Sequence, residues 1–259
     1  MKIKTIRLGI IPLVLAALLS GCSPQATETP PSDTAAPVVA PSGSPVESED
    51  FVESLLFFGE STTYHMKSRG VLSGGTETKQ VWAPRSGTVC LDESIRSVRI
   101  VLPETGEELS LRDALAKKKP KRMLLTFGLN GVIRKYSKGQ HYYNTCYRML
   151  IDLIRTASPS TEIYLGTCYP VASNMDTAAY GVSAATINQY LNTLNLWCRE
   201  LAEAERIGYF DFASALKDAN GFLRTEYQVG DGIHLTREAY LAVLSYIRAQ
   251  ESRCYQEEV

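Results

Sequence analysis

The sequence predicts an α/β fold, with a parallel β-sheet that is covered by helices on both faces. Apolar runs of four or five residues alternate along residues 51–259 with longer segments whose apolar residues recur every three to four positions. This alternation is typical of β–α units, in which crossover helices cover both faces of a parallel sheet. The roughly 200 residues of this region suffice for one domain with its own hydrophobic core.

Five short apolar segments are candidate strands, and they span residues 55–58, 80–83, 123–127, 163–166 and 208–212. Parallel sheets bind their ligands beyond the carboxyl ends of the strands. We therefore expect functional residues in the loops that follow these segments.

Three longer segments show the apolar period of a helix. The first segment is "YNTCYRMLIDLI", residues 143–154. Its apolar face is formed by Tyr143, Cys146, Tyr147, Leu150 and Ile154. The second spans residues 187–201 and the third spans 240–247, and the residues placed to cap them are Ser183 and Thr236.

The first 21 residues are typical of a bacterial signal peptide. Basic residues precede a short apolar run, residues 8–19, which is too short to span a membrane. The run ends in "LLSGC", which resembles a lipobox and implies cleavage before Cys22 and lipid attachment to it. The protein would then be extracytoplasmic and lipid-anchored to the cell membrane. Ordinary secretion with an incidental cysteine is the alternative.

Residues 22–50 are rich in Pro, Ser, Thr and Ala and lack apolar periodicity. Such a segment cannot bury enough apolar surface to fold, so we interpret it as a disordered tether in front of a folded domain at 51–259. The net charge is −1 and no basic run is present, so nothing in the sequence indicates a nucleic-acid partner.

The cysteines predict neither a metal site nor a redox site. No two of them are spaced C-x-x-C, and five remain after Cys22. Cys146 and Cys198 fall on apolar helix faces, where a free cysteine behaves as a small hydrophobic residue. One disulfide is possible outside the cytoplasm, but the sequence does not assign it.

The first candidate strand leads through Gly59 and Glu60 to Ser61, in "FFGES". The following "TTYHMKSRG" could begin a helix, and the N–H of Ser61 would then lie where negative charge is favoured. Ser61 is therefore a candidate nucleophile. A plain turn is one alternative, and a flavin-phosphate loop formed by Ser61, Thr62 and Thr63 is another.

A nucleophilic serine needs a base, and the chain has three histidines. His141 is expected on a helix surface, and His65 lies too close to Ser61 in sequence to reach back to it. His234 follows Asp231 by three residues in "VGDGIHLT", so a tight turn can bring the carboxylate to the imidazole. The alternative is that Asp231 and Gly232 only mark a turn.

Asn130 follows the third candidate strand, in "LLTFGLNGV". Its amide could donate to an oxyanion, and such donors are each worth about 10²- to 10³-fold in rate. An ordinary Asn-Gly turn is the alternative.

Together these segments resemble the SGNH hydrolases, also called the GDSL-type esterases and lipases, from about Ser54 to Ile247. "FFGES" corresponds to the nucleophile block, "GLN" to the Gly-x-Asn block and "DGIHLT" to the Asp-x-x-His block. The resemblance implies a three-layer α/β/α, flavodoxin-like fold with about five parallel strands. It also implies a triad of Ser61, His234 and Asp231.

The resemblance further implies an oxyanion hole formed by the Ser61 N–H, the Asn130 side chain and the N–H of a glycine. Gly87 is the best candidate for that glycine, with Gly70, Gly74 and Gly75 as alternatives. The sequence departs from the family in having Glu60 where Asp is usual. The family's Asp supports the loop, so the resemblance implies the same mechanism, and Glu60 marks a divergent subgroup.

The sequence as a whole predicts a membrane-anchored serine esterase that needs no metal or cofactor. The location suggests O-acetyl groups of carbohydrates or cell-wall polymers as the substrate. Residues 171–182 are expected to border the pocket, and Tyr169 and Tyr180 are candidates for stacking on a sugar or for structural roles. A surface glycan-binding lipoprotein that has lost turnover is the alternative function.

Overall fold

The computed structural model describes residues 50–256, with side chains as far as residue 250. These residues belong to one compact unit. The predicted signal peptide, the predicted lipidation site Cys22 and all of the predicted tether except residue 50 lie outside the described residues. Within the described part, no helix has both the length and the apolar character that a membrane span requires.

Five parallel strands form the central sheet, and each overlaps a segment predicted from the sequence. They are β1 (Leu55–Gly59), β2 (Val81–Trp82), β5 (Arg122–Thr126), β6 (Glu162–Gly166) and β7 (Gly208–Phe210). Their order in the sheet is β2-β1-β5-β6-β7. This is the flavodoxin-like order, in which the chain changes direction across the sheet between β1 and β5. The predicted fold class is confirmed.

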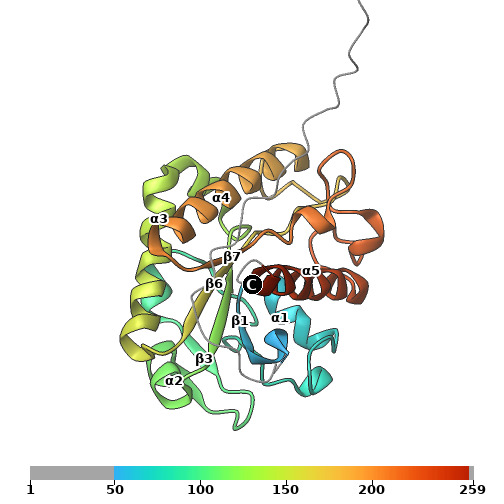
Figure 1. Ribbon diagram of the computed structural model, residues 1–259. Coiled ribbons are helices and arrows are strands. Elements are labelled where there is room, and N and C mark those ends of the chain that lie inside the picture. Colours follow the sequence, from blue (N-terminus) through green and yellow to red (C-terminus); the bar gives the residue numbers. More distant parts are fainter. Residues whose placement is uncertain (1–49, 257–259) are drawn as a thin grey trace, which may run out of the picture. The chain divides into compact units, whose positions relative to one another are not determined.

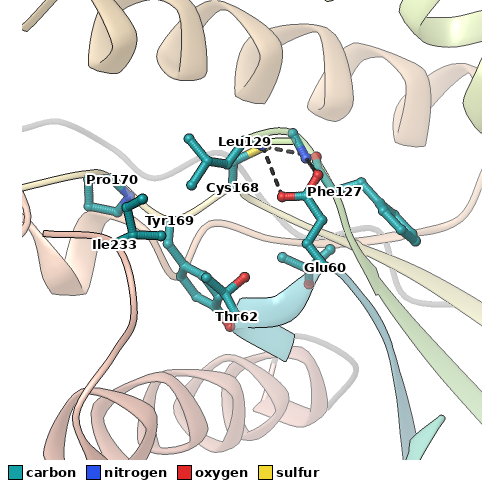
Figure 2. A pocket seen from close by; sticks show the side chains of 10 residues that line it. Glu60, Thr62, Phe127, Leu129, Cys168, Tyr169, Pro170 and Ile233 are labelled. Atoms are coloured by element: carbon teal, nitrogen blue, oxygen red, sulfur yellow. Dashed lines mark hydrogen bonds between the residues drawn. The ribbon is translucent and has the colours of Figure 1, made fainter. Parts of the chain in front are cut away.

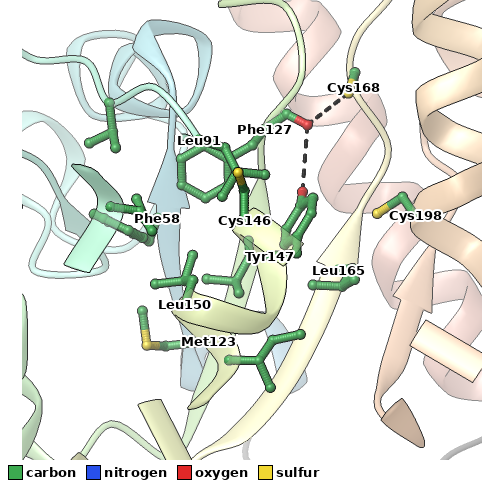
Figure 3. Packing of buried hydrophobic residues seen from close by; sticks show 14 of the residues in the cluster. Phe58, Leu91, Met123, Phe127, Cys146, Tyr147, Leu150, Leu165, Cys168 and Cys198 are labelled. Atoms are coloured by element: carbon green, nitrogen blue, oxygen red, sulfur yellow. Dashed lines mark hydrogen bonds between the residues drawn. The ribbon is translucent and has the colours of Figure 1, made fainter. Parts of the chain in front are cut away.

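Helices cover both faces of this sheet, giving three layers (Figure 1). One face packs against α2 (Leu111–Lys118), α3 (Val132–Ala157) and α4 (Ala184–Glu205). The other face packs against α1 (Ser61–Ser68) and α5 (Arg237–Gln256). The strands are apolar on both sides because alternate residues enter opposite cores: Leu56 and Phe58 face α3, whereas Leu55 and Phe57 face α5. Figure 3 shows the first of these cores.

The predicted helices are present and extend beyond their predicted bounds. Ser183 caps α4 by accepting the N–H of Thr186 at 3.1 Å, and the Thr236 hydroxyl accepts the N–H of Ala239 at 3.4 Å at the start of α5. The helix α3 contains a kink at Gly139, where φ is +81°.

Several short elements were not predicted. An antiparallel hairpin, β3 (Arg99–Val101) with β4 (Glu108–Ser110), precedes α2. Single 3₁₀ turns occur at Phe51–Ser54, Gly75–Glu77, Glu93–Ser97, Ser214–Leu216 and Thr225–Tyr227. The cysteines with described side chains are all free thiols, and Cys146 and Cys198 are buried as expected.

Candidate active site

Ser61 is the first residue of α1 and follows β1 almost directly. Gly59 makes this sharp transition possible, because a Cβ atom at this position would lie 2.4 Å from the carbonyl oxygen of Thr126 and 2.3 Å from the Thr63 hydroxyl. Glu60 is the N-cap residue of the helix. The Ser61 N–H therefore lies at a helix N-terminus, where negative charge is stabilised.

The structure brings Ser61, His234 and Asp231 together across 173 residues of sequence. Ser61 Oγ lies 3.1 Å from His234 Nε2, and His234 Nδ1 lies 2.6 Å from Asp231 Oδ2. The second oxygen of Asp231 accepts the backbone N–H groups of Ile233 and His234, each at 2.9 Å. The turn that carries His234 is thus built around the Asp231 carboxylate.

The Asp231 carboxylate is suited to remain ionised. Partial burial alone would raise its pKa, but the hydrogen bonds from the His234 side chain and the two backbone N–H groups outweigh that effect and lower the pKa. An ionised Asp231 fixes the tautomer of His234 in which Nδ1 carries a proton and Nε2 can accept one from Ser61.

His65 has a position in the site that the sequence did not indicate. Its ring lies against that of His234, with ring centroids 4.4 Å apart and planes 34° apart. The His65 ring therefore contacts the imidazole of His234. Burial lowers the pKa of His65, and the nearby His234 and Arg69 lower it further, while Asp231 opposes the shift. A helical i, i+4 spacing from Ser61 could have suggested this location.

Asn130 reaches the site from the loop after β5, the strand that neighbours β1. Its side-chain amide Nδ2 donates to the Thr88 hydroxyl oxygen at 2.9 Å and to the Val89 carbonyl at 3.1 Å. The Ser61 N–H donates to the same Thr88 oxygen at 3.1 Å. Two of the donors predicted for an oxyanion hole therefore converge on one oxygen atom, that of a residue the sequence did not single out.

Glu60 ties the nucleophile loop to the Asn130 loop. Its carboxylate lies beside Leu129 (Figure 2) and is that of a residue only 3% exposed. It accepts hydrogen bonds from the backbone N–H groups of Gly128, Leu129 and Asn130 at 2.9, 3.0 and 3.1 Å. Burial raises the pKa of Glu60, and the charge of buried Lys135 and the three N–H groups offset part of the rise. The Lys135 ammonium also donates to the Asn130 carbonyl.

The N–H group of Gly87, predicted as the third oxyanion donor, lies within a turn, and its role in the site stays a prediction. It donates to the Pro84 carbonyl at 2.9 Å. The residue is glycine because φ is +72° and because an added Cβ would lie 2.9 Å from the Tyr64 ring. Among the alternatives, the N–H groups of Gly70 and Gly75 likewise donate to nearby carbonyls.

A cavity of about 10 Å³ lies beside these residues, which is room for about one water molecule. Its lining includes chain neighbours of the site residues, namely Thr62, Leu129 and Ile233 (Figure 2). Tyr169 also lines it but is 6% exposed and packs against Phe212 and Tyr240. Tyr169 is therefore a core residue rather than an exposed ring on which a sugar could stack.

Other ligand chemistries receive little support at this site. Thr62 and Thr63 are buried, so their hydroxyls do not form the open phosphate loop that a flavin would need. Among the described residues, no group of three or more His, Cys, Asp and Glu side chains is placed to hold a metal ion.

Comparison with known proteins relates the chain to acylhydrolases. The model of the GDSL-like lipase/acylhydrolase family matches residues 57–242. A search of curated proteins gives no match. Solved structures similar to the chain include a Streptococcus pneumonia protein named as a platelet activating factor, which is 18% identical with a TM-score of 0.50 and aligns over 78% of this chain and 86% of its own. That likeness indicates a shared fold.

Two further structures are similar at lower TM-scores. The aryl esterase of M. smegmatis is 15% identical with a TM-score of 0.49, and the alignment covers 76% of this chain and 98% of the esterase. Est24, a carbohydrate acetylesterase from Sinorhizobium meliloti, is 15% identical with a TM-score of 0.48 over 77% of this chain and 98% of its own.

Proposed function

This chain belongs to the GDSL-like lipase/acylhydrolase family, and from that premise we propose that it is a serine esterase whose triad is Ser61, His234 and Asp231. One observation carries the proposal: the unbroken hydrogen-bonded chain from Ser61 Oγ through the His234 ring to Asp231. A hydroxyl, an imidazole and a carboxylate in this sequence form the arrangement that activates a serine for acyl transfer.

In the proposed reaction, Ser61 Oγ attacks the ester carbonyl carbon while its proton passes to His234 Nε2. The tetrahedral intermediate then collapses, and His234 gives the proton to the departing alcohol, which leaves an acyl group on Ser61. Water attacks this acyl-enzyme as His234 takes its proton, and that proton returns to Ser61 Oγ as the acid is released. Asp231 stabilises the imidazolium in both halves of the reaction and does not itself take the proton.

The negative charge that develops on the carbonyl oxygen would be stabilised by the Ser61 N–H and the Asn130 amide. Both groups already donate to a common oxygen at 3.1 and 2.9 Å, which is the range required of oxyanion donors. The helix α1 adds the positive end of its dipole at the same point.

For the substrate we propose esters with a short acyl group, such as O-acetyl groups on carbohydrates or cell-wall polymers. The predicted signal peptide and lipid anchor at Cys22 would place the enzyme at the outer side of the cell membrane, where such polymers occur.

The test compares Ser61→Ala with the wild type on a short nitrophenyl ester and on a panel of acetylated glycans. We expect the variant to lose all measurable hydrolysis and all labelling by a fluorophosphonate, with its thermal unfolding unchanged. Ser68→Ala, an exposed serine in the same helix, is the matched control and should keep wild-type activity. Full activity in Ser61→Ala would remove Ser61 from the mechanism. Glycan binding without serine labelling would favour the non-catalytic alternative.

A further inference from the structure

The Thr88 hydroxyl occupies the point at which the two proposed oxyanion donors converge. The Ser61 N–H lies 3.1 Å from its oxygen and the Asn130 Nδ2 atom lies 2.9 Å from it. An oxyanion formed on Ser61 would need both of these N–H groups. The Thr88 oxygen and the substrate carbonyl oxygen therefore compete for the same two donors.

Neither donor depends on Thr88 for its position. Asn130 Nδ2 also donates to the Val89 carbonyl at 3.1 Å, and the Asn130 backbone N–H donates to Glu60 at 3.1 Å. Ser61 is held in the first turn of α1, directly after β1. If the Thr88 hydroxyl moved away, both N–H groups would remain directed at the vacated point.

The Thr88 side chain can leave that point without unfolding its loop. It is half-buried, and it follows a turn that is closed by the hydrogen bond from the Gly87 N–H to Pro84. The Thr88 carbonyl is held separately by the Ser86 hydroxyl at 3.1 Å. Rotation about the Cα–Cβ bond of threonine, which has more than one accessible rotamer, would move the hydroxyl while the backbone stays in place.

We propose that the Thr88 hydroxyl fills the oxyanion hole of the free enzyme and that the ester carbonyl oxygen displaces it on binding. This inference rests on the proposed esterase function. The hydroxyl accepts hydrogen bonds from two N–H groups that would otherwise donate to water. Every substrate must replace these two hydrogen bonds before Ser61 can react. Thr88 therefore selects against esters whose carbonyl oxygen is a weak hydrogen-bond acceptor.

The test measures kcat and KM for nitrophenyl acetate in Thr88→Ala and Thr88→Ser. In Thr88→Ala the tethered competitor is gone, and only a water molecule has to be displaced. We expect kcat/KM to rise about three- to tenfold, mainly through a lower KM, because a free water molecule is displaced more easily than a tethered hydroxyl that accepts both hydrogen bonds. Labelling by the fluorophosphonate should accelerate similarly. Thr88→Ser keeps the hydroxyl and should stay within about twofold of the wild type.

An unchanged kcat/KM in Thr88→Ala would overturn this inference, because the hydroxyl would then have no effect on the reaction. A fall in kcat at constant KM would also overturn it, because the hydroxyl would then assist the reaction. Thermal unfolding of both variants distinguishes either result from misfolding. Failure of the proposed function has a different signature: the wild type itself would neither hydrolyse esters nor be labelled at Ser61. If the wild type hydrolysed esters through Ser61 but Thr88→Ala were slower, only the role proposed for Thr88 would be rejected, and the proposed function would stand.

Discussion

The imidazole rings of His65 and His234 lie against each other in the site, with centroids 4.4 Å apart. Two positive charges at this separation repel, so protonation of one ring disfavours protonation of the other. His65 is the partner held neutral, since burial, His234 and Arg69 all lower its pKa and Asp231 only partly opposes them. A neutral His65 would leave His234 free to take the proton from Ser61 in the proposed reaction.

This arrangement predicts a pH dependence of stability. The pKa of His65 is lower in the folded protein than its ordinary value of 6.5, so the unfolded chain binds more protons as the pH falls below 6.5. The His65 contribution to the free energy of unfolding is therefore present above that value and is lost as the pH falls through the folded pKa.

His65→Phe keeps an aromatic ring against His234 and removes the titration. We expect its melting temperature to fall less between pH 7 and pH 5 than that of the wild type, as measured by circular dichroism. His141→Phe, which replaces an exposed histidine of α3, is the control and should follow the wild-type profile. Parallel profiles for His65→Phe and wild type would contradict the assignment.

At the scale of elements, Glu60 fastens the loop after β5 to the start of α1. Three consecutive backbone N–H groups of one loop bind a single carboxylate from the other. The two loops follow adjacent strands, at the point where the chain order of the sheet reverses. A carboxylate can accept hydrogen bonds from all three N–H groups. A neutral amide has an NH₂ group in place of one oxygen, and this donor would face one of the backbone N–H donors.

Glu60→Gln should therefore displace Asn130 relative to Ser61. We expect kcat to fall about 10- to 100-fold with little change in KM, which is less than the effect of deleting an oxyanion donor outright. Glu60→Asp keeps the charge and is the residue usual in the family, so it should recover part of the loss. The measurement is steady-state hydrolysis of nitrophenyl acetate.

Glu162→Gln is the matched control for this substitution. Glu162 pairs with Arg122 at 2.9 Å at the opposite, amino-terminal edge of the sheet. Its loss should leave kcat and KM unchanged. If Glu60→Gln also kept the wild-type kcat, the carboxylate would not be positioning Asn130.

At the scale of the whole described molecule, the site depends on how α5 packs against the nucleophile helix. The buried hydroxyl of Tyr240, in α5, donates to the carbonyl of Thr62, which lies 178 residues earlier and next to Ser61. His234 sits just before α5. We therefore expect this contact to set the distance between the helix that carries the proposed nucleophile, Ser61, and the segment that carries the proposed base, His234.

Tyr240→Phe leaves the Thr62 carbonyl buried without this donor. We expect the free energy of unfolding to fall by about 1–3 kcal/mol and kcat/KM to fall several-fold, measured by denaturant unfolding and nitrophenyl acetate hydrolysis. Tyr209→Phe, which removes a hydrogen bond to the Asn195 carbonyl away from the site, should cost stability but not activity. Equal kcat/KM in all three proteins would show that α5 packing does not set the site geometry.

Most of the central sheet could be predicted from the local pattern of apolar residues. Each central strand is a run of apolar residues because it is buried on both faces, so runs such as 55–58 and 123–127 marked the sheet directly. The hairpin Arg99–Val101 with Glu108–Ser110 was missed because its strands have three residues each and only one fully buried position, Ile100. Such short, mixed strands carry no period that a sequence can reveal.

The sequence by itself determined the α/β class, the positions of the five central strands and of the three longest helices, and the residue types of the candidate site, because apolar period, turn residues and short motifs are local properties. Only the tertiary structure decided which groups meet at Ser61. The contacts of the Thr88 hydroxyl with Ser61, of the His65 ring with His234 and of Glu60 with Gly128 span 27, 169 and 68 residues of chain. Contacts over such separations arise from how the sheet orders its strands, and no local pattern encodes them.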